Sequence, residues 1–127
     1  MTATLANTVL DLAALDRRAV NRALQEAERG DFTVTNPGGA HALACGLMHP
    51  IGVTIRGHAG YYCAGMNKEA TVTVEGNAGT GVAENMMSGT VRVTGDASQS
   101  AGATGHGGLL VIEGNTSARC GISMKGI

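Results

Sequence analysis

Short segments of alternating apolar and polar residues recur through most of the chain. Four of them stand 19 residues apart, namely VTIR at 53–56, VTVE at 72–75, VRVT at 91–94 and LVIE at 110–113. A two-residue period is typical of a β-strand that buries one face. The constant interval therefore predicts a repeated structure with one strand in each repeat.

Glycine follows the same interval. Steps of 19 residues land on a glycine each time, at Gly38, Gly57, Gly76, Gly95 and Gly114. One strand and its turns cannot bury their own apolar face, whereas stacked repeats bury it against their neighbours. Because 19 is not a multiple of six, the pattern disfavours a left-handed hexapeptide helix. We predict a right-handed parallel β-helix with coils of about 19 residues, in which these corner glycines take positive φ and let adjacent coils approach closely.

Columns of like residues support the stacking. The sixth position after each glycine is small or apolar, at Ala44, Cys63, Val82, Ala101 and Cys120. On the strand side, we expect much of the core from Val72, Val74, Val91, Val93, Val111 and Ile112, although the run LLVIE leaves the inward set of its strand open. Asn77, Asp96 and Asn115 suit a turn position, which His58 also occupies.

The N-terminal segment 1–31 lacks the repeat. DRRAVNRALQEAERGD at 16–31 predicts an amphipathic helix with Asp16 as N-cap, Gly30 as stop and an apolar stripe of Ala19, Val20, Ala23, Leu24 and Ala27. We expect this helix to cap the repeats of 32–127, whose first strand is FTVTNP at 32–37. The coil from Gly114 stops before its strand, so we expect an open end that self-associates or meets a partner.

Composition narrows the possible functions. The 127 residues carry a net charge of −1 and only 2% aromatic residues, which disfavours nucleic-acid binding. No apolar run has the length of a membrane helix, and the N-terminus does not resemble a signal peptide. Three cysteines at irregular spacing do not form a disulfide framework. We expect a cytoplasmic protein without a membrane partner.

Four histidines are candidates for a metal site: His41, His49, His58 and His106. His49 and His106 share a repeat position but would lie three coils apart, roughly 14 Å, which is too far for one metal ion. The same spacing separates Cys63 from Cys120, and Cys45 has no partner at matching spacing. The glycine clusters are explained by turns and precede no helix. We therefore expect no catalytic, cofactor-binding or metal-binding residue on this chain.

The methionines gather at one corner of the predicted coils. Every methionine except the first falls there: Met48, Met66, Met86, Met87 and Met124. Flexible methionine side chains fill irregular space inside a fold, and they also form adaptable docking surfaces. Both interpretations stand, and the second makes these residues a candidate interface.

Three segments resemble a known family. GHAGYYCAGMN, GNAGTGVAENMMSGTVRVTGDASQSAGATGHGGLLVIEGN and RCGISMKG are similar to the β-helical C-terminal domain of the glutamate synthase large subunit. The resemblance covers about residues 30–127. More specifically, these segments resemble the stand-alone small subunit of N-methylglutamate synthase and related amidotransferases. It implies a scaffold without catalytic residues. FMN and an iron–sulfur cluster are expected in a partner subunit, and glutamine hydrolysis in another.

Three functions follow from these considerations. The first is a scaffold subunit that holds a glutaminase, a class II amidotransferase, against an FMN-dependent synthase. The second is the analogous subunit of a formylmethanofuran dehydrogenase-type complex, a more distant relative with the same repeat. The third is a free-standing β-helix enzyme, which would show acidic or histidine clusters along one outer face.

Overall fold

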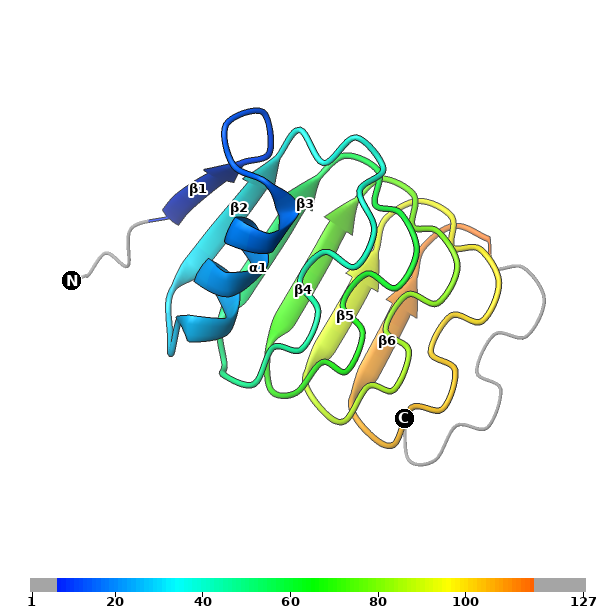
Figure 1. Ribbon diagram of the computed structural model, residues 1–127. Coiled ribbons are helices and arrows are strands. Elements are labelled where there is room, and N and C mark those ends of the chain that lie inside the picture. Colours follow the sequence, from blue (N-terminus) through cyan, green and yellow to red (C-terminus); the bar gives the residue numbers. More distant parts are fainter. Residues whose placement is uncertain (1–6, 116–127) are drawn as a thin grey trace.

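The computed structural model describes residues 7–115 and forms a right-handed parallel β-helix (Figure 1). The described part holds a single helix, α1 (Arg17–Glu26), between the first two strands. The strands are β1 (Asn7–Asp11), β2 (Asp31–Thr35), β3 (Gly52–Arg56), β4 (Thr71–Glu75), β5 (Thr90–Val93) and β6 (Leu109–Ile112). They lie in sequence order in one sheet, and every neighbouring pair is parallel.

The register confirms the predicted repeat. Gly52 pairs with Thr71, Thr71 with Thr90, and Thr90 with Leu109, so these coils all advance by the predicted interval. The two earlier coils are longer. Asp31 pairs with Gly52, and Asn7 pairs with Asp31 across a coil that is lengthened further because it contains α1. The repeat did not reveal β1, which lies in the segment without the regular interval.

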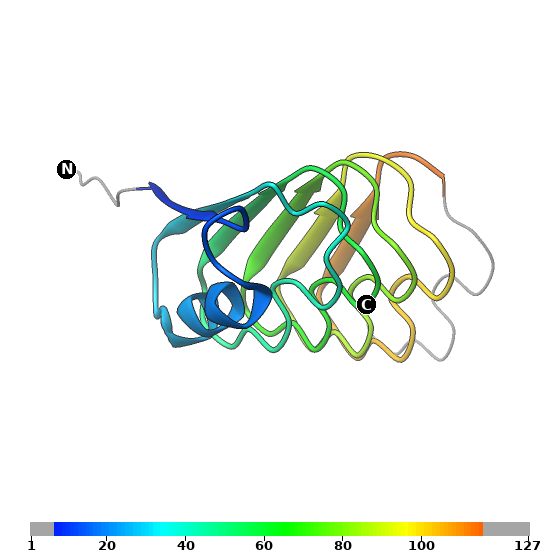
Figure 2. The same ribbon diagram turned by 45° about the horizontal axis from the view of Figure 1, so that its top comes forward.

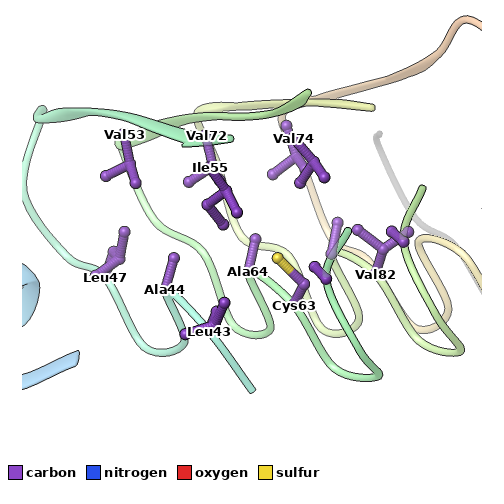
Figure 3. Packing of buried hydrophobic residues seen from close by; sticks show 14 of the residues in the cluster. Leu43, Ala44, Leu47, Val53, Ile55, Cys63, Ala64, Val72, Val74 and Val82 are labelled. Atoms are coloured by element: carbon purple, nitrogen blue, oxygen red, sulfur yellow. The ribbon is translucent and has the colours of Figure 1, made fainter. Parts of the chain in front are cut away.

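The core lies between the sheet and the turns that face it. Four of the predicted strand residues are buried: Val72, Val74, Val91 and Val93. Figure 3 shows Val72 and Val74 pointing from the sheet towards Cys63 and Val82 on the opposite side. The prediction for Val111 is wrong, because Val111 pairs with Arg92 on the outer face of the sheet. Leu110 and Ile112 pair with Val91 and Val93 instead, so they continue the inner columns.

The turns opposite the sheet form a second regular layer, which we call the turn wall and define as residues 42–48, 62–68, 81–87 and 100–106. It runs below the sheet in Figure 2. Three alternating positions of every coil take positive φ, in the columns Ala42, Tyr62, Gly81 and Ser100, then Ala44, Ala64, Ala83 and Gly102, then Gly46, Met66, Asn85 and Thr104. This alternation points backbone groups along the stack. Ala64 N–H donates to Leu43 O (2.9 Å), and Ala83 N–H to Cys63 O (2.8 Å).

Gly38 and Gly57 take positive φ as predicted, whereas the three later corner glycines are needed for close approach of the coils. Gly76, Gly95 and Gly114 lie outside the positive-φ region, so that part of the prediction is wrong for them. A Cβ on Gly76 would lie 2.7 Å from Gly57 O and 2.8 Å from Gly57 C, which leaves no room for a side chain. Gly38 is not opposite Gly57, because Pro37 occupies the space beneath Gly57 in the longer coil.

Helix α1 covers the N-terminal end of the coils beside the turn wall (Figures 1 and 2). Asp16 is the N-cap as predicted, and its Oδ1 accepts from Ala19 N–H at 2.7 Å. The helix ends at Glu26, before the predicted Gly30, because Ala27 is already extended. Val20 and Leu24 are buried, and Ala23 and Ala27 pack against the core at partial burial.

A stripe of polar side chains on α1 takes the place of the turn wall in the coil between β1 and β2. Asn21 donates to Ala42 O and accepts from Ala44 N–H, both at 2.8 Å. Gln25 donates to Cys45 O at 2.7 Å, and Arg17 makes a longer contact of 3.4 Å with His41 O. One coil later, the residues equivalent to His41, Ala44 and Cys45 bond instead to backbone groups of the coil before them. Side chains of α1 thus substitute for backbone at the open edge.

Between residues 7 and 115, no helix has the length and apolar character needed to cross a membrane.

Candidate functional site

Polar side chains at the corner beside the sheet connect successive coils. His58 Nδ1 accepts from Asn77 N–H at 2.9 Å, Asn77 Oδ1 from Asp96 N–H at 2.8 Å, and Asp96 Oδ1 from Asn115 N–H at 2.8 Å. Each acceptor is the residue that follows a corner glycine. The backbone N–H groups at this corner are therefore satisfied by the column itself, which explains why His58 occupies the slot of Asn and Asp.

His41 makes the same kind of bond. Its Nδ1 accepts from Tyr61 N–H at 3.0 Å, and its ring stacks on Tyr61 with 3.6 Å between centroids. An accepting Nδ1 carries no proton, so the neutral ring of His41 or His58 carries its proton on Nε2. Neither ring then offers a free Nε2 lone pair to a metal while this bond persists.

The other two histidines lie in different columns. His106 N–H donates to Met86 O (2.7 Å), just as Met87 N–H donates to Asn67 O (2.8 Å) and Lys68 N–H to Leu47 O (2.9 Å). His106 therefore shares its column with Met87 and Lys68, so the predicted match with His49 is wrong. The coil between β2 and β3 holds an additional residue near Pro50, which displaces His49 by one position. Within the part of the chain that the structure describes, no three His, Cys, Asp or Glu side chains gather as metal ligands.

Two cysteines lie in the described region, and neither forms a disulfide there. Cys63 is fully buried, and its burial, with a smaller effect of nearby Cys45, raises the pKa of the Cys63 thiol to about 12. Cys45 is half-buried, and burial also raises its pKa. The thiolate is the nucleophile, so both thiols are poorly reactive and neither suits nucleophilic catalysis. Cys120 lies outside the described residues.

Iodoacetamide at pH 8 should alkylate Cys45 of the native chain slowly and leave Cys63 unmodified. Both thiols disfavour ionisation, but only Cys45 is accessible to the reagent. The two residues fall in different tryptic peptides, so mass spectrometry measures each rate separately. In denaturant, both should react at similar rates. Alkylation of Cys63 in the native chain as fast as of Cys45 would show that its site opens to solvent.

The structure divides the predicted methionine interface. Met86 is fully buried in the core, so for this residue the filling interpretation is correct. Met48, Met66 and Met87 are 57%, 46% and 50% exposed, and Met124 lies outside the described residues. The three exposed residues come from three successive coils of the turn wall. They remain candidates for a docking surface.

Lys68 stands at the centre of these methionines. Met48 and Met87 occupy its column in the preceding and following coils, roughly 5 Å away along the stack. Met66 precedes Lys68 by two residues, and the alternation of the turn wall turns both side chains outwards. We call Met48, Met66, Lys68 and Met87 the methionine patch.

Asn67 holds the backbone beneath the methionine patch. It is fully buried between Met66 and Lys68, and its Nδ2 donates to Ala70 O (2.9 Å) and Ser88 O (3.0 Å). These bonds connect two coils and fix the direction of the neighbouring exposed side chains. No sequence pattern indicated this role, because the equivalent positions hold Leu47, Met86 and Gly105 and therefore show no polar column.

The polar stripe of α1 was also missed. Arg17, Asn21 and Gln25 are spaced by four residues, so they share one face of the helix beside the apolar stripe. That spacing was a readable signal. Its meaning depends on the backbone edge that the stripe meets, which the sequence does not display.

These features define a stacked β-helix whose turn polar groups mostly serve the stack itself. Over 61 residues, the chain is 58% identical to Protein GlxC of Rhizobium meliloti (strain 1021). The matched stretch is 45% of this chain and 27% of GlxC, so the chain spans about a quarter of that relative. No protein-family model matches the chain, and no solved structure matches it.

Proposed function

We propose that this chain is a non-catalytic scaffold subunit of a glutamate-synthase-type oxidoreductase or glutamine amidotransferase complex, most specifically of N-methylglutamate synthase. The proposal rests above all on the use of the polar side chains at the corner. His58, Asn77 and Asp96 each hold the next coil through its backbone N–H, which commits these groups to stacking. A rigid column of this kind is suited to presenting surfaces to other subunits.

Two further observations support this assignment. The sequence segments quoted above resemble the β-helical domain of glutamate synthase, and the β-helix fold of the chain agrees with that resemblance. The 58% identity to Protein GlxC shows that 45% of this chain has a close counterpart in a longer protein. We assign the glutaminase and the FMN-dependent synthase, with its iron–sulfur cluster, to partner subunits.

The methionine patch is the surface that we assign to docking. Three thioethers surround Lys68, so the patch combines adaptable apolar contact with one central charge. Exposed methionine side chains can fit a partner of irregular shape, because they change rotamer readily. The buried Asn67 beneath them keeps the supporting backbone fixed.

The experiment compares the chain alone with the chain co-expressed with a class II amidotransferase and an FMN-dependent synthase of the same genome. Alone, it should show neither flavin absorbance nor glutaminase activity. Together, the three should elute as one complex that contains flavin and hydrolyses glutamine. A monodisperse chain that binds FMN or hydrolyses glutamine unaided would overturn the proposal, as would failure of the three to associate.

A pair of double variants tests the docking surface. Met66→Glu with Met87→Glu places two charges in the methionine patch and should release the chain from the complex. Val9→Glu with Leu109→Glu adds the same charges at exposed apolar positions of the sheet, and it should leave the complex intact. Equal behaviour of the two double variants would remove the methionine patch from the proposal.

A further inference from the structure

Helix α1 carries a concentration of positive charge on the side that it turns away from the core. Arg17, Arg18 and Arg22 are all exposed, and they border a surface hollow between α1 and the first turns. Asn21, Gln25, Ala42 and Cys45 form the rest of its lining. We call the three arginines the arginine surface. The lining contains no acidic residue.

Between residues 7 and 115, the arginine surface has no acidic partner. All ten Asp and Glu residues lie between residues 7 and 115, so each of them is described. The ion pairs in that range are Arg56 with Glu75 and Arg92 with Glu113, on the outer face of the sheet. None involves the arginine surface, although the whole chain has a net charge of −1. Three guanidinium groups therefore stay available to an anionic partner.

The position of these arginines opposes helix stability. Arg17 and Arg18 are the first two residues of α1, and its first turn contains no acidic residue. The N-terminus of a helix carries partial positive charge, so it favours acidic side chains and disfavours cations. Arg17 has one long contact with His41 O, whereas Arg18 and Arg22 have no hydrogen bond within the described chain. A local arrangement that costs stability without an internal gain marks a site of function.

We propose that the arginine surface binds a carboxylate-rich segment of a partner protein. Guanidinium groups bind carboxylates through paired N–H donors, and that geometry favours arginine over lysine at such contacts. Nucleic acid fits poorly, since aromatic residues make up 2% of the chain and three cations cover few phosphates. The proposal rests on the proposed function, in which the partner is a subunit of the same complex.

A labelled hexaglutamate peptide is the probe, and fluorescence anisotropy at low salt measures its dissociation constant. Arg18→Gln with Arg22→Gln should raise that constant about tenfold, and added salt should weaken binding to the unaltered chain. The control is Arg29→Gln with Arg56→Gln, which removes the same charge from exposed positions outside both proposed surfaces and should change the constant less than about twofold. Equal weakening by both double variants would overturn the proposal, and so would equal affinity for hexaglutamine or tighter binding of an oligothymidylate.

Thermal unfolding tests whether the arginine substitutions weaken peptide binding only because they destabilise the fold. Because Arg18 lies against the positive end of α1, the Arg18→Gln, Arg22→Gln variant should unfold at no lower temperature than the unaltered chain. Loss of peptide binding together with an unchanged melting temperature supports a binding role. A clear fall in melting temperature would assign these arginines to folding and overturn the proposal.

The same variant in the assembled complex separates this proposal from the proposed function. A complex that dissociates more readily, and whose dissociation depends less on salt, supports the arginine surface as a contact. A complex that forms and is indifferent to the substitution overturns the arginine surface and leaves the scaffold function standing. If the chain binds hexaglutamate through Arg18 and Arg22 but joins no glutaminase or flavin subunit, the scaffold function fails and the acidic-segment site stands.

Discussion

Replacing Gly76 with alanine should lower the free energy of unfolding by about 3 kcal/mol. The added Cβ would stand 2.7 Å from Gly57 O and 2.8 Å from Gly57 C, which are backbone atoms of the preceding coil. A flexible side chain can turn away from such a contact, but a backbone can yield only if the two coils separate. Urea denaturation followed by far-ultraviolet circular dichroism measures the effect.

Gly39 provides the matched comparison, because it separates backbone strain from crowding. Its φ is +75°, and a Cβ there would meet no atom within 4 Å. Gly39→Ala therefore carries only the penalty of left-handed backbone, about 1–2 kcal/mol. Thr73→Ser, on the outer face of β4, should stay within about 0.5 kcal/mol. If Gly39→Ala is the more destabilising alanine variant, close coil contact is not the reason for glycine at position 76.

The strand side of this fold was readable because its geometry has a simple period. A parallel strand alternates strictly between its two faces, so VTVE and VRVT give their orientation and the constant spacing gives their register. The prediction failed where the apolar run gave no alternation. LLVIE contains four apolar residues in succession, and only pairing with β5 shows that Leu110 rather than Val111 faces the core.

The turn side was less readable because every second residue of its backbone takes positive φ. Residues such as Ala42, Tyr62 and Met66 take positive φ there, although their types give no sign of it. Adjacent Met86 and Met87 therefore separate into one buried and one exposed side chain, which composition could not distinguish.

The coil between β2 and β3 made the 19-residue interval misleading for a different reason. Two additional residues between β2 and β3 place Gly38 at the repeat interval from Gly57 without making it the partner of that glycine.

The candidate surfaces were partly predictable. The clustering of methionines along the repeat indicated the methionine patch, although Met86 had to be removed from it. The arginine surface could not be predicted from the sequence, for a physical reason. A cation is notable only when its neighbours fail to neutralise it, and that depends on where the acidic residues lie in the fold. Arg56 and Arg92 find Glu75 and Glu113 one coil away, whereas the arginines of α1 find none.

Replacing Asn21 with leucine should destabilise the chain by about 2 kcal/mol, because two backbone groups lose their partners at once. The amide of Asn21 donates to Ala42 O and accepts from Ala44 N–H, both at 2.8 Å and partly buried. In later coils, the equivalent of Ala44 N–H bonds to backbone of the preceding coil, so α1 must supply that acceptor here. Leucine has similar bulk and a higher helix propensity than asparagine, but it supplies neither a donor nor an acceptor.

Hydrogen exchange at Ala44 gives the local measurement that a change in global stability alone would not. In the unaltered chain, the Ala44 N–H is held by Asn21 Oδ1, so it should exchange slowly. In Asn21→Leu it should exchange faster than the neighbouring turn amides, whereas Asn21→Asp, which retains the acceptor but loses the donor to Ala42 O, should keep much of the protection. Glu26→Leu, on the same helix and exposed, is the control and should leave Ala44 unchanged. If Ala44 remains equally protected in Asn21→Leu, the side chains of α1 do not act as the missing coil, and apolar packing of Val20 and Leu24 alone explains the cap.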